Sequence, residues 1–501
     1  MAEGFDTIIV GAGSSGGVLA ARLTEDPTHR VLLLEAGPDF ANEARRLPLF
    51  AVSGEHSWLV PGLPEFDWGF HDEDRAGRRG GRPIWLPRGR LVGGSSMVNS
   101  TIAARPAPFD LDRWAEMGNP GWSWSDVLPA FVKLETDLDF GDEAIHGSDG
   151  PITIRRYPQD AWAPVNRTFA EGCTTLGIRH APDLNALDAH AGIFGPMPHN
   201  RWKEIRQGTL VTYLRTARPR PNLTIRGGCT VDRVLLDGKS CTGVRYLGPD
   251  GLRRAEATTT VIAAGVYNSP AILQRSGIGP ADLLARLHIT TAADLPVGRH
   301  LTDHPGVAFL FHAPKIAAVT GRFFATNWRG PAVRGPEPEW QTHPFPADEE
   351  EGICGFWTYL CRQESVGCVE IRSGDPKEAP MIDHDYLADP EDERRFARGW
   401  TAARELLATA PFRSAGARWL EPDLDLATHL RANLAPAHHQ SGTCRMDRDP
   451  KRGVVGPDLR VHGIDGLMVC DSSVFPDTVM HNTNLACYAL GEVAAQRWRP
   501  H

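Results

Sequence analysis

Hydrophobic and polar positions near the start of the chain predict a strand–helix–strand unit. Residues 7–10 are all β-branched, which is typical of a parallel strand buried on both faces. Residues 18–23 predict a helix, and residues 30–34 predict a second strand. This alternation indicates an α/β fold. Further along the chain we expect strands at residues 222–225, 231–235, 260–265 and 466–476, and an apolar helix at residues 486–498 that is opened by residues 482–485.

Composition and charge narrow the class of protein. The 501 residues are 41% hydrophobic and 23% charged, as in a globular chain of about three domains or one large enzyme. A net charge of −9 offers no basic face for nucleic acid. There is no apolar run of about 18 residues and the first residues are acidic, so we expect a cytoplasmic protein without a signal peptide or transmembrane segment. Nine cysteines without a C-x-x-C pair indicate no disulfide framework, and we expect no bound metal.

A glycine-rich turn joins the first predicted strand to the first predicted helix. Gly11 allows the tight turn, Gly13 lets the backbone approach a pyrophosphate, and Gly16 permits close packing of the helix on the strand. The helix N-terminus then directs unpaired N–H groups at the phosphates. Glu35 ends the second strand about 20 residues further on, where an acid binds the adenosine ribose. The motif predicts a dinucleotide but does not choose between NAD and FAD.

A second glycine cluster lies at residues 87–99. Its paired glycines and serines offer backbone N–H donors to a flat or anionic group, although a plain loop has the same composition. Residues 89–112, however, resemble the first signature of the glucose–methanol–choline flavin oxidoreductases at every position. Residues 265–279 resemble the second signature except at Val266, where the family usually has proline or a small or hydroxylated residue. A further family landmark matches within residues 297–305.

The resemblance extends from residue 7 to about residue 496 and implies both a fold and a cofactor. It implies an α/β protein in which a Rossmann-like FAD-binding domain is interleaved with a substrate-binding domain built on an antiparallel sheet. Some choline-oxidising relatives attach FAD through a histidine at the position of Val98, so we expect non-covalent FAD here. The expected FAD-binding parts are residues 1–155, 205–310 and 430–501, and the expected substrate-binding parts are residues 156–204 and 311–429.

The glycine motifs and the resemblance together give a set of expected FAD contacts. The resemblance places Val231 at the adenine, while Asp471 and Ser472 end a predicted strand, where flavin contacts are apt. The whole set comprises Gly11, Gly13, Ser14, Ser15, Gly16, Glu35, Ala36, Arg90, Val92, Gly93, Gly94, Ser95, Asn99, Val231, Ala264, Asp471, Ser472, Asn482 and Thr483.

The C-terminal part of the chain carries the expected catalytic pair. Residues 438–446 resemble the family motif H-x-x-G-T-C-x-M, in which the histidine three residues before the glycine, here His439, is the base. His438 matches a variable position, and we interpret it as a neighbour of the base. Asn482 matches the position of the second catalytic group, although it is also a good helix N-cap. His481 is the alternative candidate for that second role.

The oxidation of an alcohol requires a base and a hydrogen-bond donor, and histidine and asparagine can supply them. The hydroxyl proton must be removed while the α-hydrogen leaves as hydride, and an imidazole with a pKa near about 6.5 together with an asparagine amide suits these tasks. The resemblance therefore implies FAD-dependent oxidation of a primary or secondary alcohol, with His439 as base and Asn482 holding the alkoxide. Thr483 replaces a common proline and Ala486 a common threonine, so we expect differences in the placement of the flavin ring.

Several alternatives stay open at this stage. Hydroxynitrile lyases that contain FAD also resemble this family, and they leave the flavin oxidised. The electron acceptor is O₂ or an organic molecule, so an oxidase and a dehydrogenase are not separated. A quaternary ammonium substrate is disfavoured, because no aromatic cage with a carboxylate can be placed. Both a monomer and a homodimer are compatible with the sequence.

Two loop-rich stretches are candidates for shaping access to the site. Residues 330–351 hold five prolines and end in four acidic residues. Long loops often act as lids, although a solvated acidic turn is the commoner structure for such a charge run. We expect the aromatic side chains of residues 40–80 to line the entrance. That stretch contains Trp58, Pro61, Pro64, Phe66, Trp68 and Phe70.

Overall fold

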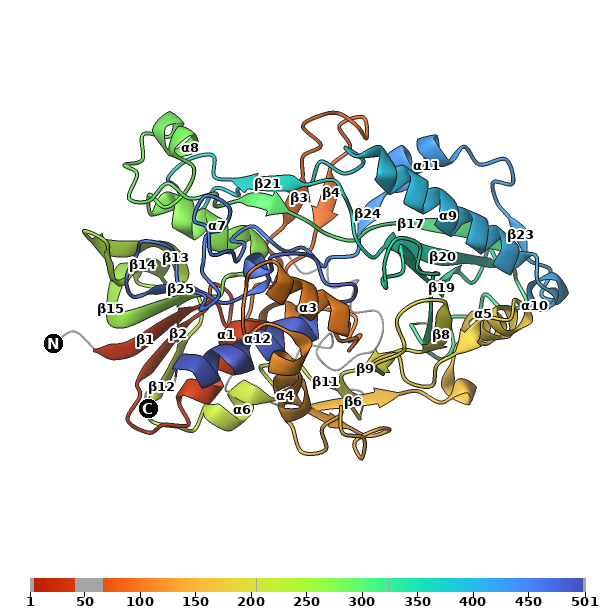
Figure 1. Cartoon of the computed structure of the whole chain (residues 1–501), viewed down its shortest axis with the longest axis horizontal. Helices are drawn as coiled ribbons and strands as arrows, with labels where there is room; N and C mark the ends of the chain where they lie inside the picture. Colours follow the sequence, from red (N-terminus) through yellow and green to blue (C-terminus); the bar gives the residue numbers. More distant parts are fainter. Residues whose placement is uncertain (1–3, 41–65, 204, 323, 499–501) are drawn as a thin grey trace.

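The computed structural model describes residues 4–40, 66–203, 205–322 and 324–498, which form two large sheets with helices packed on them (Figure 1). The first sheet lies on the left of the figure and confirms the expected α/β class. Its strands in spatial order are β12 (Leu223–Arg226), β2 (Val31–Leu34), β1 (Phe5–Val10), β15 (Gly251–Ile262), β14 (Ser240–Gly248) and β13 (Thr230–Asp237), with β25 (Leu467–Val469) beside the end of β15. The strands β12, β2, β1 and β25 are parallel to β15, whereas β13 and β14 form an antiparallel meander with its first half.

The register of the parallel strands makes them end at one level. Val10 lies opposite both Leu34 and Ile262, and Ile262 lies opposite Val469. These central strands are almost completely buried, which explains why most of their residues are apolar. The residues that follow each strand therefore meet at the same edge of the sheet, where ligands bind in open α/β folds.

Helices cover this first sheet, and the first and last of them pack closely against each other. A Cβ atom on Gly491 would lie 2.9 Å from the carbonyl oxygen of Ser15, so the glycine allows the helices α1 and α12 to cross at short range. The buried carboxylate of Glu492 binds Arg22 across this crossing. The helices of this part are α1 (Ser14–Leu23), α3 (Pro108–Glu116), α4 (Trp124–Leu134), α6 (Tyr213–Ala217), α7 (Gly265–Arg275), α8 (Ala281–Arg286) and α12 (Thr483–Trp498).

The second sheet lies on the right of Figure 1 and is antiparallel except for one pair, as expected for the substrate-binding part. An aromatic core that includes Phe309, Phe356 and Trp400 joins it to its helices. Its strands in order are β23 (Arg418–Trp419), β17 (Pro305–His312), β20 (Ile353–Leu360), β19 (Trp340–Asp348), β18 (Thr326–Arg329), β8 (Ile193–Pro196) and β7 (Arg179–His180), with β24 (Ala435–Pro436) beside β17. The helices are α5 (Pro164–Thr175), α9 (Pro390–Leu407), α10 (Ala410–Ser414) and α11 (Leu426–Asn433). The domain boundaries stay a prediction.

The structure corrects the expectation of a loop at residues 330–351. Residues 340–348 form strand β19, which pairs with β20 along its whole length. The strand β18 pairs with β19 only at Gln341 and Thr342, so the rest of that edge is open. Pro344 and Pro346 lie on this open part, where a missing N–H breaks no ladder. The acidic residues 348–351 form an exposed turn into β20.

Shorter elements connect the two large sheets. These remaining strands are β3 (Phe70–Asp72) with β4 (Ile84–Leu86), β5 (Glu135–Asp137) with β6 (Ile152–Arg156) and β9 (Pro198–His199), β10 (Arg201–Trp202) with β11 (Ile205–Arg206), and β16 (Arg299–Leu301) with β21 (Gly367–Glu370) and β22 (Met381–Asp383).

Among the described helices, none combines the length and the apolar character that a membrane span requires.

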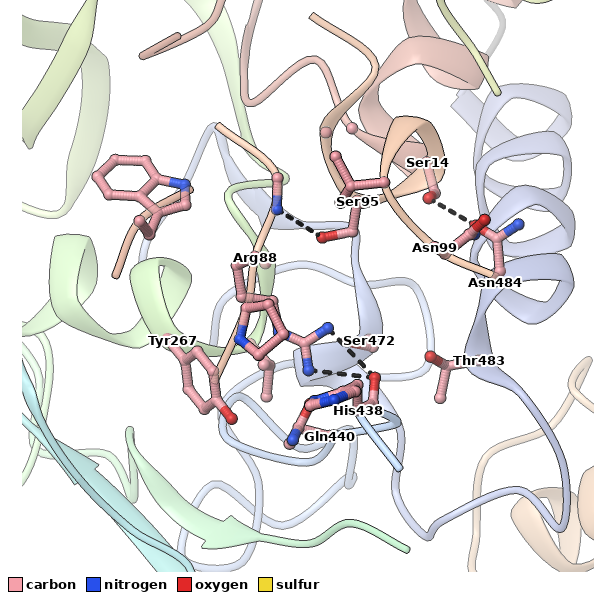
Figure 2. Close-up of a pocket in the computed structure, with 18 of the residues that line it drawn as sticks. Ser14, Arg88, Ser95, Asn99, Tyr267, His438, Gln440, Ser472, Thr483 and Asn484 are labelled. Carbon is pink, nitrogen blue, oxygen red and sulfur yellow. Dashed lines mark hydrogen bonds between the residues drawn. The ribbon is translucent and has the colours of Figure 1, made fainter. Parts of the chain in front are cut away.

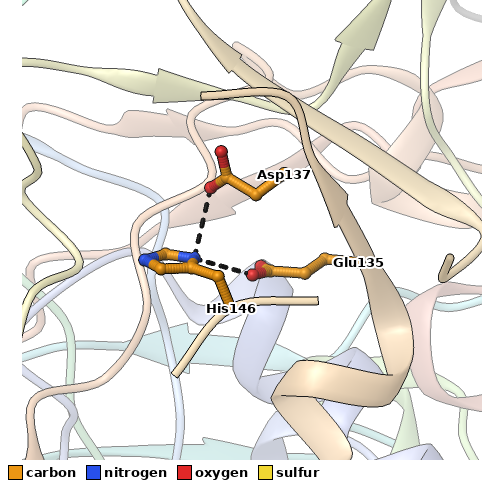
Figure 3. Close-up of side chains that lie close together, drawn as sticks. All are labelled: Glu135, Asp137 and His146. Carbon is orange, nitrogen blue, oxygen red and sulfur yellow. Dashed lines mark hydrogen bonds and ion pairs between the residues drawn. The ribbon is translucent and has the colours of Figure 1, made fainter. Parts of the chain in front are cut away.

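A buried network of charged side chains ties β5 and β6 to the loop after β7 (Figure 3). The Nδ1 atom of His146 lies 2.8 Å from Glu135 Oε1 and 3.2 Å from Asp137 Oδ2, and its Nε2 lies 3.0 Å from Asp183 Oδ2. Burial alone would lower the pKa of His146, but hydrogen bonds to the three carboxylates raise it to about 10. Two guanidinium groups complete the network, so that three positive charges balance three negative ones. The six members are Arg105, Glu135, Asp137, His146, Arg156 and Asp183.

The same cluster has the geometry of a possible cation site. One ligand atom from each of Glu135, Asp137 and His146 lies within 4.8 Å of the others. Arg105 and Arg156, however, already bind these carboxylates, so the network is balanced without an added cation. The expectation that the protein binds no metal stays a prediction.

We expect His146→Gln to lower the free energy of unfolding by about 3 kcal/mol near pH 7, because it leaves the buried network with three carboxylates and two positive charges. The pKa of His146 is higher in the folded chain than its ordinary value of 6.5, so its contribution is complete below about pH 6.5 and is lost as the pH rises through about 10. Urea unfolding over this pH range should show a falling midpoint in the parent and a flatter profile in His146→Gln. His180, which is exposed on β7, provides the control variant His180→Gln. Equal pH profiles for the parent and His146→Gln would contradict this account.

Candidate active site

A cavity of about 850 Å³ lies between the two sheets, at the edge where the parallel strands end. Its volume is in the upper part of the range of about 300–1,000 Å³ that is usual for small-molecule sites. Figure 2 shows polar side chains around it, with Ser14, Asn99 and Asn484 on one side and Tyr267 and Gln440 on another. Three features of the wall determine its chemistry: a glycine-lined groove, a histidine–asparagine pair and an aromatic face.

The glycine-lined groove forms where two turns of backbone touch. A Cβ atom on Gly94 would lie 2.7 Å from the Cα atom of Gly13, and one on Gly11 would lie 2.3 Å from the carbonyl oxygen of Ala263. Gly13 precedes α1 without a side-chain cap, so the first N–H groups of this ten-residue helix are left for a ligand. Bare backbone donors and a positive helix end suit the phosphates of a dinucleotide.

Glu35 is fixed at the end of β2 beside this groove. Its two carboxylate oxygens accept hydrogen bonds from the backbone N–H groups of Ala12 at 3.0 Å and Gly37 at 2.9 Å. Burial raises the pKa of Glu35 to about 7, and these hydrogen bonds oppose that rise. The side chain thus lies where the sequence motif predicts a ribose-binding acid, and Val231 lines the same cavity from β13.

Asp471 lies at the same edge of the sheet as Glu35, but beyond the end of β25. It follows β25, and its Oδ2 accepts a hydrogen bond from the N–H of Gly265 at 2.9 Å at the start of α7. Ser269 donates to the same oxygen, and the N–H of Ser473 donates to Oδ1 at 2.8 Å. The carboxylate therefore fixes the turn between β25 and the segment that carries Ser472 into the cavity wall.

His439 and Asn482 lie side by side in the cavity wall. The amide Nδ2 of Asn482 donates to His439 Nε2 at 2.8 Å, and His439 Nδ1 lies 2.9 Å from His304 Nδ1. Because Asn482 donates, Nε2 carries a lone pair, and the ring proton on Nδ1 is shared with His304. Burial holds the pKa of His439 well below its ordinary value. The neighbouring imidazoles of His304 and His438 lower it further, because a protonated ring beside them would be repelled by their positive charge. The ring is therefore neutral.

The backbone around His439 is held by two side chains that the sequence did not single out. Asp303 accepts a hydrogen bond from the N–H of His439 at 2.8 Å. Arg88 donates to the carbonyl oxygen of His438 at 3.2 and 3.1 Å (Figure 2). This carbonyl belongs to a residue with a φ of +67°, a left-handed conformation that is strained for histidine. Both contacts fix the turn that presents the His439 ring.

His481, the alternative to Asn482, points elsewhere. Its Nδ1 accepts a hydrogen bond from Gln341 Nε2 at 2.9 Å, and the residue does not belong to the cavity wall. Asn482 immediately precedes α12, which starts at Thr483, three residues before the expected start of the apolar run. The structure thus brings Asn482, and not His481, to His439.

Most of the predicted cofactor contacts line the cavity, but four do not. Gly16 packs under Gly11, whose carbonyl oxygen would lie 2.0 Å from an added Cβ atom. Val92 is completely buried in the core, and Gly93 packs against Met97. Arg90 lies over the ring of Trp68 at 5.4 Å. The ones that line it are Gly11, Gly13, Ser14, Ser15, Glu35, Ala36, Gly94, Ser95, Asn99, Val231, Ala264, Asp471, Ser472, Asn482 and Thr483.

An aromatic face of the second sheet forms the wall opposite the glycine groove. His343 pairs with Trp357 and Gln341 pairs with Tyr359 across β19 and β20, so these side chains share one face. The Trp357 ring lies over Gly306 of β17, where a Cβ atom would come within 2.6 Å of it. Phe345 lies in the same way over Gly355, at 2.5 Å from an added Cβ atom.

The first loop-rich stretch contributes aromatic residues to this cavity as well. Trp68 and Phe70 both line it, and their rings stack with centroids 5.8 Å apart. Their role at an entrance stays a prediction. Trp58, Pro61 and Pro64 lie outside the described residues.

Comparisons with known proteins agree with this arrangement. Two family models, both described as GMC oxidoreductase, match residues 5–306 and 363–491. The chain is 34% identical to 5-(hydroxymethyl)furfural oxidase of Methylovorus sp. (strain MP688), over 98% of each chain. It is also 34% identical to oxygen-dependent choline dehydrogenase of Escherichia coli O17:K52:H18, over 99% of this chain and 95% of the relative. The solved structure of pyridoxine 4-oxidase from Mesorbium loti superimposes with a TM-score of 0.91 and 30% identity, over 99% of this chain and 100% of the other.

We expect Gly94→Ala to lower the flavin content of the purified protein at least about tenfold, because the new Cβ atom would press on Gly13, 2.7 Å away. Flavin per protein is measured from the visible and near-ultraviolet absorbance. Gly238 provides the matched control: its φ of +57° resembles the +52° of Gly94, but an added Cβ atom meets nothing within 4 Å. Gly238→Ala should therefore keep its flavin. Equal flavin content in both variants would contradict the assignment of the groove.

Proposed function

The chain belongs to the glucose–methanol–choline (GMC) oxidoreductase family, and from that premise we propose that it uses FAD to oxidise an uncharged aromatic primary alcohol to the aldehyde. The observation that carries this proposal is the neutral His439 ring, whose Nε2 lone pair lies 2.8 Å from the Asn482 amide in a cavity with an aromatic wall. This pair is a base next to a hydrogen-bond donor, which is what a hydroxyl group needs to become an alkoxide.

FAD fits the donor set of the cavity. GMC oxidoreductases are FAD flavoproteins. The groove between Gly13 and Gly94 with the start of α1 would hold the pyrophosphate, Glu35 the ribose and Val231 the adenine. When bound, the flavin would supply the acceptor for the hydride that leaves the carbinol carbon. Val98 lines the cavity and has no nucleophile, which supports non-covalent binding.

The residues of this chain bind the substrate hydroxyl group and accept its proton. His439 Nε2 accepts the hydroxyl proton of the substrate, which takes the place of the Asn482 N–H at this lone pair. The Nδ1–H of His439, already directed at His304, keeps the ring in the tautomer in which Nε2 is unprotonated. Asn482 has two N–H groups on Nδ2; one donates to His439, and the other is free to hold the developing alkoxide. Asp303, through the backbone N–H of His439, keeps the ring in position.

The substrate class follows from the wall around this pair. Trp357, Tyr359 and Phe345 present apolar rings, and the carboxylates in the described wall are Glu35, Asp67 and Asp471, none of which belongs to β19 or β20. A quaternary ammonium substrate would require a carboxylate beside the aromatic rings. The names of two relatives point the same way, since 5-(hydroxymethyl)furfural and pyridoxine carry hydroxymethyl groups on aromatic rings. Because two relatives are called oxidases, we propose O₂ as the electron acceptor.

We expect His439→Gln to slow flavin reduction by an aromatic alcohol about 100- to 10,000-fold, because the proton acceptor is lost. Asn482→Ala should slow it about 100- to 1,000-fold, as the alkoxide loses its donor. Anaerobic stopped-flow absorbance measures both rates. His481→Gln is the control and should change the rate less than about tenfold, since its ring binds Gln341 instead. A loss in His481→Gln as large as that in Asn482→Ala would refute the assignment.

Acid denaturation tests the mode of FAD binding. Because Val98 offers no atom for a covalent link, the flavin is expected in the supernatant after acid precipitation and centrifugation. Its absorbance there should account for all the flavin of the native protein. Yellow colour that stays with the pellet would show a covalent attachment.

A further inference from the structure

His343 is a buried histidine in the cavity wall, and the described part of the chain offers its Nδ1 atom no hydrogen-bond partner. It lies in the middle of β19, is 5% exposed and lines the cavity. Its Nδ1 atom is buried and has no partner among the described residues. Burial alone lowers the pKa of His343 to about 3, so the ring is neutral and offers one N–H donor and one acceptor.

The surroundings of His343 contain rings and no polar group that satisfies it. Phe324 meets the imidazole edge to face, with centroids 5.2 Å apart, and Tyr359 does so at 6.1 Å. Trp357 is its cross-strand neighbour. An unsatisfied polar group destabilises a buried site, and a leucine or phenylalanine would fit such an aromatic wall better. Because Nδ1 has almost no accessible surface, a ligand would form its hydrogen bond at the part of the imidazole that lines the cavity.

Tyr359 places His343 and His439 along one path. The Tyr359 ring centroid lies 6.1 Å from that of His343 and 6.3 Å from that of His439. Because both imidazoles lie beside one tyrosine ring in the cavity wall, a substrate whose hydroxymethyl group meets His439 can extend toward His343. The rings of Trp357 and Phe345 lie over Gly306 and Gly355 and line the same cavity.

We propose that His343 is a specificity-determining residue that forms a hydrogen bond to an uncharged polar substituent on the far side of an aromatic alcohol. The inference rests on the proposed function, which it makes more specific. The substituent is uncharged because the described wall formed by β19 and β20 contributes no charged side chain to the cavity. A hydroxymethyl, hydroxyl or carbonyl group meets this requirement.

A pair of alcohols of equal shape tests the proposal. The substrates are para-(hydroxymethyl)benzyl alcohol and para-ethylbenzyl alcohol, which differ in one hydroxyl against one methyl group. In the parent enzyme kcat/KM should favour the hydroxymethyl compound about 10- to 100-fold after correction for its two equivalent ends, and the difference should lie mainly in KM. In His343→Leu the ratio should fall to within about threefold, whereas His343→Gln should retain part of it.

Two controls separate recognition from a structural role. His71 is exposed on β3, and His71→Leu should keep the preference of the parent. Because His343 is unsatisfied, His343→Leu should melt at the same temperature as the parent or a few degrees higher. A preserved ratio in His343→Leu, a lower melting temperature, or an equal loss in His71→Leu would overturn the proposal.

The same experiment distinguishes this inference from the proposed function. If both alcohols reduce the flavin of the parent enzyme without a preference, the assignment of His343 is wrong and the oxidation of aromatic alcohols stands. If neither alcohol reduces the flavin, the proposed function is overturned, and the role of His343 is overturned with it.

Discussion

The level at which the parallel strands end is the constraint on which the rest of the structure depends. Val10 lies opposite Leu34 and Ile262, so the chain leaves the sheet at one edge from three neighbouring strands. A shift of one residue in any strand would move its terminal residue away from the edge. The glycine groove, Glu35 and the turn after β25 exist at that edge because of this register, and the C-terminal segment brings its histidine and asparagine to the same place.

Burial gives the candidate site its chemical character. A buried imidazole loses its charged form, so the His439 ring is neutral, and its partners His304 and Asn482 determine which nitrogen carries the proton. The same burial leaves His343 neutral but without a partner. In the network around His146, by contrast, buried positive and negative charges balance each other.

Local patterns predicted much of this structure, and tertiary contacts explain what they missed. The first strand–helix–strand unit followed from an apolar run and the glycines between Gly11 and Gly16, both local in sequence. The pairing of His439 with Asn482 needed a family resemblance, because 43 residues separate them. The prolines of β19 indicate a loop, but they are compatible with a strand because the edge on which they lie is open, and sequence alone does not show an open edge. Arg88 acts on a residue 350 positions away, and no local signal marks such a contact.

An anaerobic absorbance titration of the purified flavoprotein with aromatic alcohols, followed by readmission of air, tests the central claim most directly. The account predicts that an aromatic primary alcohol bleaches the flavin in the absence of O₂ and that the colour returns within seconds in air, with formation of hydrogen peroxide and the aldehyde. Recovery over many minutes would indicate a dehydrogenase with an organic acceptor. A flavin that stays oxidised with every alcohol, while a cyanohydrin is cleaved, would contradict the account and indicate a lyase.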